Sequence, residues 1–366
     1  MIGQLIETGC RVAPGLSRWY LDHYVSIKRF EKQVRHNLGF PAPPSSVTLL
    51  VTYACNFGCY HCESTSHPKA EWGLPFETIA RLIRELREMG VKVLIISGGE
   101  PLVRPDLFEI MGLANQLGFK VLLCTNGSLV ERHQEQLARV QPDCVFTSVD
   151  GLEDTNDRFR CHPGAFKQTF RALELFQMMG VRGRMVNTMV HPDNLEELDE
   201  LGDWIMNSAA TTWRIALALP SGRARGQERF CLTDDQIRSV LRFIRGRRAR
   251  FPVYLSEEVG YIGPWALQVR SKPFSSGDGL SHFAIMPTGD VIGSGVLHDP
   301  TYSEGNVKER TLKDIWQHGF QQYRQPVLPQ DCYTCRHLHA CGGGTFGMRV
   351  GNRHCLKRLW EGGEDA

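Results

Sequence analysis

The stretch Cys55-Asn56-Phe57-Gly58-Cys59-Tyr60-His61-Cys62 decides how this sequence folds and what it does. Its cysteines are spaced C-x3-C-x2-C, and they follow a run of β-branched and apolar residues, 47–52, that predicts a strand. In parallel α/β folds, binding groups lie at the carboxyl ends of strands, so the triplet stands where a site belongs. Three thiolates are one short of the four protein ligands usual for structural zinc or for a four-iron cluster.

The triplet alone leaves two metals open. A [4Fe–4S] cluster on three cysteines would keep one iron free for a substrate or cofactor. Zinc is the alternative, with His61 or His67 as its fourth ligand. Metal or redox chemistry is favoured over disulfides, because 12 cysteines in 366 residues are too few for a disulfide scaffold and too clustered for core packing.

Segments with strand and helix patterns alternate along the chain, beginning with the strand that precedes the triplet. Strands are predicted over residues 47–52, 91–96, 120–124, 143–149, 184–190 and 212–218. Helices are predicted over residues 76–89, 105–117, 134–140, 166–179 and 195–206. This alternation predicts an α/β fold with a parallel sheet, either a doubly wound sheet or a partial barrel.

The rest of the chain divides by composition. Residues 1–45 are predicted to be a helical lead-in, 46–220 the α/β core, 221–274 an Arg-rich helical bridge and 275–366 a small separate domain. In the bridge, residues 223–250 hold nine arginines against three acids. Such a run is either a solvated helix face or a dock for an acidic peptide.

Charge and hydropathy exclude several classes of protein. A net charge of +2 argues against a globally basic nucleic-acid binder. No apolar run reaches the roughly 18 residues of a membrane span, and the N-terminus lacks the pattern of a signal peptide. We therefore expect a cytoplasmic protein that binds neither nucleic acid nor membrane.

Three further motifs follow successive predicted strands. They are Ser97-Gly98-Gly99-Glu100-Pro101, Thr125-Asn126-Gly127 and Ser148-Val149-Asp150-Gly151. Together with the triplet, they resemble the radical S-adenosylmethionine (SAM) superfamily over residues 46–220. The resemblance implies a partial (β/α)6 TIM-like barrel whose [4Fe–4S] cluster, held by Cys55, Cys59 and Cys62, binds SAM and reduces it to a 5′-deoxyadenosyl radical.

The resemblance also implies which residues contact SAM. The Gly98–Glu100 segment would hold the methionine amine, with Glu100 as a charged acceptor, and Tyr60 would lie on the adenine side. Ser148, Asp150 and Arg160 would contact the ribose and the carboxylate. From the residues alone, Asp150 could instead belong to a turn, and Arg160 could be a surface cation.

A second group of cysteines lies near the C-terminus, with the spacing Cys332-x2-Cys335-x5-Cys341-x13-Cys355. Alone it fits zinc or iron–sulfur equally. Next to a radical SAM core, it resembles a SPASM/twitch extension of α+β type, including a hairpin at 287–289. A full SPASM domain holds two auxiliary clusters, but residues 251–331 contain no cysteine, and Ser281, Ser294 and Thr345 stand about where thiols of the nearer one would be. We therefore expect one auxiliary [4Fe–4S] cluster, with zinc as the alternative.

SPASM/twitch proteins mostly modify ribosomally made peptides, so the resemblance implies a peptide-maturing oxidoreductase or lyase that crosslinks, epimerises or excises residues. Its implied partners are a precursor peptide, a separate leader-recognition protein and an electron donor such as flavodoxin or ferredoxin. One alternative is a radical SAM enzyme acting on a haem precursor, sugar or nucleoside. Another is a zinc-binding interaction module without catalysis. Cys161 is a candidate hydrogen-atom donor.

Overall fold

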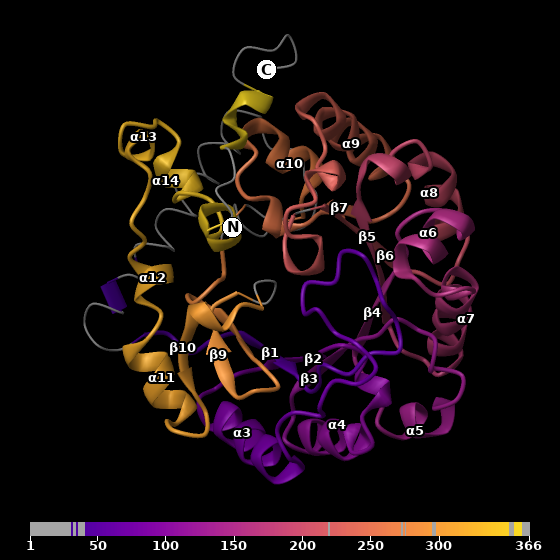
Figure 1. The fold of residues 1–366 in the computed structure, drawn as a ribbon, viewed down its shortest axis with the longest axis vertical. Helices are drawn as coiled ribbons and strands as arrows, with labels where there is room; N and C mark the ends of the chain where they lie inside the picture. The colour runs from indigo at the N-terminus through magenta and orange to yellow at the C-terminus, as the bar shows by residue number, and fades with distance from the viewer. Residues whose placement is uncertain are drawn as a thin grey trace, which may run out of the picture.

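The computed structural model describes residues 31, 34–35, 41–218, 220–271, 274, 276–294, 298–350 and 355–360. The predicted lead-in at 1–45 therefore lies almost wholly outside the described residues. Figure 1 shows the described chain as a ring of strands surrounded by helices.

The strands of the described residues form one sheet in the order β10-β9-β8-β1-β2-β3-β4-β5-β6-β7. Neighbours from β8 through β1 to β7 are parallel, whereas β9 and β10 are antiparallel additions. The order runs from β1 to β7 without the reversal of a doubly wound sheet, so the partial barrel is confirmed. The strands are β1 (Ser46–Leu50), β2 (Val93–Ser97), β3 (Lys120–Cys124), β4 (Cys144–Ser148), β5 (Gly183–Val190), β6 (Thr212–Leu217), β7 (Val253–Leu255), β8 (His282–Ile285), β9 (Asp290–Ile292) and β10 (Ser303–Asn306).

Helices follow most of the strands and cover the outside of the barrel (Figure 1). In the barrel they are α3 (Phe76–Glu88), α4 (Leu107–Gln116), α5 (Gln134–Arg139), α6 (Glu153–Arg160), α7 (Ala165–Met178), α8 (Leu198–Met206), α9 (Asp234–Arg247) and α10 (Ala266–Val269). The C-terminal helices are α11 (Leu312–His318), α12 (Gln321–Arg324), α13 (Gln330–Tyr333), α14 (Leu338–Cys341) and α15 (Phe346–Val350).

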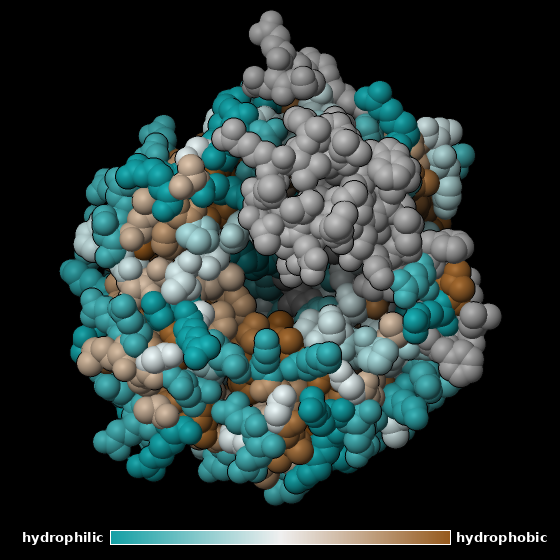
Figure 2. All heavy atoms as spheres, turned by 180° about the vertical axis from the view of Figure 1, so that it is seen from behind, coloured by the Kyte–Doolittle hydropathy of each residue, from teal (hydrophilic) through white to brown (hydrophobic). Residues whose placement is uncertain are grey.

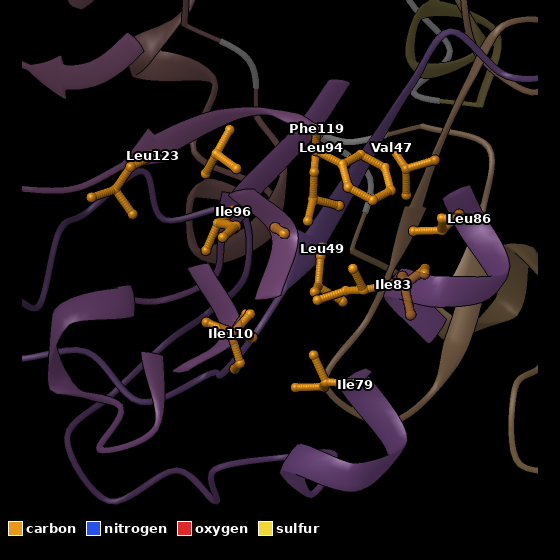
Figure 3. Packing of buried hydrophobic residues seen from close by; sticks show 14 of the residues in the cluster. Val47, Leu49, Ile79, Ile83, Leu86, Leu94, Ile96, Ile110, Phe119 and Leu123 are labelled. Carbon is orange, nitrogen blue, oxygen red and sulfur yellow. The ribbon is translucent and has the colours of Figure 1, made fainter. Parts of the chain in front are cut away.

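The main core lies between the sheet and the first helices. Every second residue of β1 and β2 points outward, so Val47, Leu49, Leu94 and Ile96 meet the apolar stripe of α3 (Figure 3). That stripe consists of Ile79, Leu82, Ile83 and Leu86, all at most 1% exposed. The spacing of apolar residues thus predicts both the elements and the face that each one buries.

The predicted hairpin at 287–289 is confirmed: it joins β8 to β9, and Gly289 has a positive φ of 96°. β8 also pairs with β1, from Ser46 opposite His282 to Leu49 opposite Ile285. The first strand of the predicted C-terminal domain thus continues the barrel sheet. The domain boundaries themselves remain predictions.

Among the described elements that were not expected from the sequence, two belong to the barrel and bear on the site. The first is α6, a polar helix inserted between β4 and α7, which carries Arg160. The second is β7, which pairs with β6 inside the stretch interpreted as a helical bridge. Its three residues are too few to give a periodic signal.

The rear face of the molecule is hydrophilic at its periphery and hollowed near its centre (Figure 2). Within the described ranges, no helix combines the length and apolar character needed to cross a bilayer.

Candidate active site

The three N-terminal cysteines lie in a loop that leaves the carboxyl end of β1 (indigo, near the centre of Figure 1). All three are free thiols. Burial raises the pKa of Cys55 to about 12 and that of Cys59 to about 11, and the neighbouring thiols of the triplet add to both shifts. The thiols of Cys55 and Cys59 are therefore protonated, and a bound metal would deprotonate them.

This donor set fits an iron–sulfur cluster, because three cysteines lie together without disulfides. The described residues contain no group of three His, Cys, Asp or Glu side chains already arranged as a metal site. The loop thus brings the thiols near one another, and a bound cluster would complete their geometry.

The Gly98–Glu100 segment packs against the backbone that leads into Cys55. Gly99 N donates to Thr52 O at 2.7 Å, and Glu100 N donates to Ala54 O at 2.9 Å. A Cβ on Gly98 would lie 2.4 Å from Thr52 O, and one on Gly99 would lie 2.3 Å from Ala54 O. Here, the glycines allow one backbone to approach another.

The carboxylate of Glu100 is fully buried and joins this segment to the next loop. Oε1 accepts from Leu102 N at 3.0 Å and from Thr125 Oγ1 at 2.9 Å, and Oε2 accepts from Asn126 N at 2.6 Å. Burial raises the pKa of Glu100 to about 7, while these three donors oppose the rise. The carboxylate that we expected to hold the methionine amine thus binds donors of the protein itself.

Two asparagines, for which the motifs predicted no individual role, extend this hydrogen-bond network to the cysteine loop. Asn126 Nδ2 donates to Asn56 Oδ1 at 2.9 Å, and Asn56 Nδ2 donates to Ser128 Oγ at 2.9 Å. Asn56 lies between the first two cysteines, so the loop after β3 holds the cysteine loop directly. In the sequence, the only hint of this contact was that a polar residue, Asn56, stands between two cysteines of the triplet.

Asp150 and Arg160 form a buried ion pair, with 2.6 Å between Oδ2 and Nη2. Asp150 Oδ1 also accepts from Met189 N at 2.8 Å. Burial alone would raise the pKa of Asp150, but the Arg160 guanidinium, with His61 and the hydrogen bond from Met189 N, lowers it overall. Arg160 is therefore no surface cation. Its charge also acts on Cys59, where it favours the thiolate.

Two neighbouring aromatic rings of the triplet, Tyr60 and His61, differ in their exposure. Tyr60 is 42% exposed, and its ring is tilted against Phe159 with the ring centroids 6.5 Å apart. His61 lies inside and stacks on Phe159 at 4.5 Å, which in turn stacks on His191 at 4.1 Å. Burial lowers the pKa of His61 to about 4, so its ring is neutral.

Arg223, just beyond β6, is a site residue that the sequence did not single out individually. Its Nη1 donates to Cys59 O at 2.5 Å, its backbone N donates to Cys62 O at 2.9 Å, and its Nη2 donates to Ser66 O. A Cβ on Gly222 would lie 2.4 Å from Cys62 O. The sequence hint for Arg223 was its position after the sixth strand, because the carboxyl ends of parallel strands meet at one edge of the sheet.

Known proteins resemble this chain in sequence. A family model described as the Radical SAM superfamily matches residues 49–205. The mycofactocin maturase MftC of Mycolicibacterium smegmatis is 30% identical over 314 residues, covering 84% of this chain and 79% of that protein. The chain belongs to the radical SAM superfamily.

Other relatives carry different names. The AdoMet-dependent heme synthase of Oleidesulfovibrio alaskensis is 29% identical over 315 residues, covering 80% of each protein. The solved structure of Streptococcus suis SuiB bound to S-adenosylmethionine matches with a TM-score of 0.69 at 18% identity, covering 87% of this chain and 76% of that one. At that identity the likeness confirms the fold alone. Superfamily membership implies SAM and a [4Fe–4S] cluster as cofactors.

The arginines of residues 223–250 in this radical SAM protein are largely engaged within the chain. Arg223 holds the cysteine loop, and Arg247 pairs with Asp199 and Asp203 on α8. Others contact carbonyl oxygens, side chains or rings, namely Arg225, Arg229, Arg238, Arg242, Arg245 and Arg248. Some of these contacts, such as those of Arg245 and Arg248, are with neutral groups and do not cancel the charge of the arginine, so the dock for an acidic peptide stays a prediction.

The second cysteine group lies on short segments at the C-terminal end. Cys332 lies in α13, Cys341 ends α14, and Cys335 lies between these helices. Burial raises the pKa of Cys332, and the thiols of Cys355 and Cys335 add to the rise, so these three are neighbours. All four are free thiols and suit an iron–sulfur cluster or zinc.

The places expected for ligands of a nearer auxiliary cluster carry hydroxyls. Ser294 is buried, and Thr345 Oγ1 donates to Glu258 O at 3.4 Å. A Cβ on Gly293 would lie 2.4 Å from the ring of Tyr323, which contacts Phe346 at 4.1 Å between ring centroids. Close by is a cavity of about 60 Å³, lined by Ser276, Leu280, Tyr323, Arg324, Pro326, Gly342, Gly344 and Arg349.

Proposed function

We propose that this enzyme holds its [4Fe–4S] cluster on Cys55, Cys59 and Cys62 and abstracts a hydrogen atom from a residue of a ribosomally made precursor peptide. When bound, the cluster and SAM supply the 5′-deoxyadenosyl radical that makes the abstraction. The observation that carries the proposal is the convergence of the Glu100 network, the Asp150–Arg160 pair and Arg223 on the cysteine loop.

The residues of the chain have distinct parts in this proposal. Glu100 positions the loops after β1, β2 and β3, and we assign the acceptors for the methionine amine to the backbone carbonyls of residues 98–100. Arg160 is held by Asp150, and its Nε has no hydrogen-bond partner among the described residues, so it has a donor left for the SAM carboxylate. Ser148, at the end of β4, is placed for the ribose, and His61 replaces Tyr60 on the adenine side.

The peptide substrate is supported by relatives. A mycofactocin maturase is 30% identical to this chain, and the fold is that of SuiB, one structure of which is described as bound to its precursor peptide SuiA. We propose crosslinking, epimerisation or excision of a residue as the outcome. A separate leader-recognition protein and a flavodoxin- or ferredoxin-type electron donor complete the proposal.

A haem precursor is the second candidate substrate. Heme synthases from three organisms are 26–29% identical over at least 80% of this chain, and an Fe-coproporphyrin III synthase is 26% identical. The same site would then act on a small molecule instead of a peptide. The auxiliary cluster on Cys332, Cys335, Cys341 and Cys355 would serve either reaction by accepting the electron of the product radical.

The test is turnover of both substrates. Anaerobically reconstituted enzyme, SAM and dithionite are incubated with the short peptides encoded beside its gene and, separately, with iron coproporphyrin III. Mass spectrometry then follows 5′-deoxyadenosine and each substrate. A mass change in a peptide supports the proposal, whereas a change in the porphyrin alone replaces it with the second candidate. Bound zinc without a visible absorption band would indicate the interaction module.

A further inference from the structure

Three neighbouring strands place polar side chains in one row inside the barrel. Ser148 of β4 is in register with Asn187 of β5, which is in register with Arg214 of β6. In each strand, the described neighbours of these residues are buried toward the helices, as Trp213 and Ile215 are beside Arg214. Residues in register on parallel strands point to the same face, so all three side chains point into the barrel.

Arg214 is fixed at one end of its guanidinium. Nη2 donates to Ser256 Oγ and to Glu258 Oε1, both at 2.7 Å, and Ser256 Oγ donates to Glu258 Oε2 at 2.7 Å. Although burial alone would lower its pKa, Glu258 and the weaker influence of Glu257 together raise it, so the guanidinium stays charged. Its orientation is therefore set before any ligand arrives.

The other two nitrogens of the guanidinium form no hydrogen bond with the residues that the structure describes. Among the described residues, Nε and Nη1 have no hydrogen-bond partner, and neither is fully buried, since 29% of the side chain is exposed. Across the interior, Arg214 interacts with the thiol of Cys124 on β3, a neutral group whose pKa burial raises to about 12. In the same row, Asn187 Oδ1 is buried without a partner. The interior thus offers a charged donor and, beside it, an acceptor.

We propose that Arg214 binds a carboxylate of the substrate inside the barrel. Parallel strands lie about 4.8 Å apart, so Arg214 stands two strands, or about 10 Å, from Ser148. A group held there lies next to SAM, if SAM occupies the site proposed above. The inference therefore rests on the proposed function and adds the class of substrate to it.

The charge of the site selects a monoanion. Glu258 already neutralises much of Arg214, so the pair suits a carboxylate better than a phosphate dianion. A guanidinium presents parallel N–H groups that match the two oxygens of a carboxylate. The carboxylate belongs either to the substrate peptide or, for the second candidate, to a propionate of a porphyrin.

The test compares acid and neutral forms of each probe. SAM-loaded, reconstituted enzyme is titrated anaerobically by calorimetry with the precursor peptide, as free acid and as C-terminal amide, and with a peptide whose Asp and Glu are replaced by Asn and Gln. A second pair is iron coproporphyrin III and its tetramethyl ester. We expect one acid form to bind about tenfold or more tightly than its neutral partner, because a charge-assisted hydrogen bond is lost in the neutral form.

Variants assign that difference to Arg214. In Arg214→Gln, the acid and the neutral form should bind within about twofold of each other, and Arg214→Lys should keep part of the difference. The double variant Arg214→Gln/Glu258→Gln removes both charges together and avoids leaving Glu258 buried alone. Arg225→Gln is the matched control, because Arg225 is exposed and pairs with Asp299 instead.

Two outcomes would overturn the inference. In one, Arg214→Gln enzyme still binds the acid form of a probe more tightly than its neutral form. In the other, wild-type enzyme binds the acid and neutral forms equally well, for the peptide and for the porphyrin. These are binding results and do not depend on turnover. Failure of the proposed function shows separately, as an unchanged peptide mass in the turnover experiment, even if the acid probe binds through Arg214.

Discussion

The two cysteine groups differ in how much of the fold supports them. The N-terminal loop is held by the backbone of residues 98–100, by Asn126 and by Arg223, and Cys55 is buried. The C-terminal group lies on helices of four residues and is held by local bonds, such as Cys335 N to Cys332 O at 3.1 Å. Cys355 is exposed.

On the proposal that each group holds a cluster, this difference corresponds to two ways of making a metal site. The barrel builds the first loop from contacts distant in sequence, so its shape does not depend on the metal. The cysteines of the second group lie on short helices, and small sites of that kind take much of their folding free energy from the metal.

The largest effect is expected from removing the first triplet. Replacing Cys55, Cys59 and Cys62 by Ala should abolish formation of 5′-deoxyadenosine and lower the iron content from about eight to about four per chain, since each [4Fe–4S] cluster carries four irons. Iron analysis and product chromatography measure both. Cys231→Ala is the control. If all iron disappears, the second group does not hold a cluster on its own.

Replacing Cys332 and Cys335 by Ala should remove the other four irons, about half of the total, and leave the first site able to cleave SAM. Because the group lies at the end of the chain on short helices, the midpoint of barrel unfolding should stay unchanged, while limited proteolysis after residue 326 should accelerate. A barrel that unfolds at lower denaturant would contradict the separation of the two sites.

Glu100→Ala should destabilise the protein by about 2–4 kcal/mol, because it leaves three buried donors without an acceptor (Leu102 N, Thr125 Oγ1 and Asn126 N). Urea unfolding of the apoprotein measures the loss. Because Gln keeps one side-chain oxygen as an acceptor, Glu100→Gln should lose less stability than Glu100→Ala. If the Ala variant were as stable as the wild type, the result would contradict the positioning role of Glu100.

The same carboxyl group predicts a pH dependence. Its pKa is about 7 in the folded protein against an ordinary value of 4.5, so between those values the folded state binds more protons than the unfolded state. The free energy of unfolding should therefore fall as pH rises through this window, by up to about 1.4 kcal/mol per pH unit. Urea titrations from pH 5 to 7 should show this slope in wild type and a weaker one in Glu100→Gln.

The smallest effect is expected at Arg223. Arg223→Ala frees the carbonyls of Cys59 and Ser66, so we expect about a tenfold slower rate of SAM cleavage, the cost of about one hydrogen bond to a charged group. Arg223→Lys should recover part of the rate, and the electron paramagnetic resonance spectrum of the reduced first cluster should shift. Arg225→Ala, two residues away, should leave rate and spectrum unchanged.

The sequence predicted the barrel well because its elements obey clear periods. The apolar stripe of α3 and the run of β3 are both found at the predicted places. α6 was missed because it is polar and short, and β7 because three residues show no period. The pairing of β8 with β1 joins residues more than 200 positions apart, and no local pattern encodes such a contact.

For the site, the motifs predicted which loops meet but not what each side chain does. Glu100, placed by its motif as a ligand contact, is turned inward to bind the next loop. His61 and Tyr60 are adjacent aromatic rings in the triplet, and only the packing on Phe159 shows that His61 lies inside. Arg223 was one of nine arginines in its stretch until its contacts with the cysteine loop were known.

Hydrogen exchange on the apoprotein and on the reconstituted enzyme tests the comparison most directly. The amides of Cys55, Gly99, Glu100 and Asn126 all donate to acceptors of the protein, so they should be protected in both forms. The segment 328–350 should gain protection only with the metal. Free exchange of the cysteine loop in the apoprotein, or equal protection of the C-terminal segment in both forms, would contradict the account.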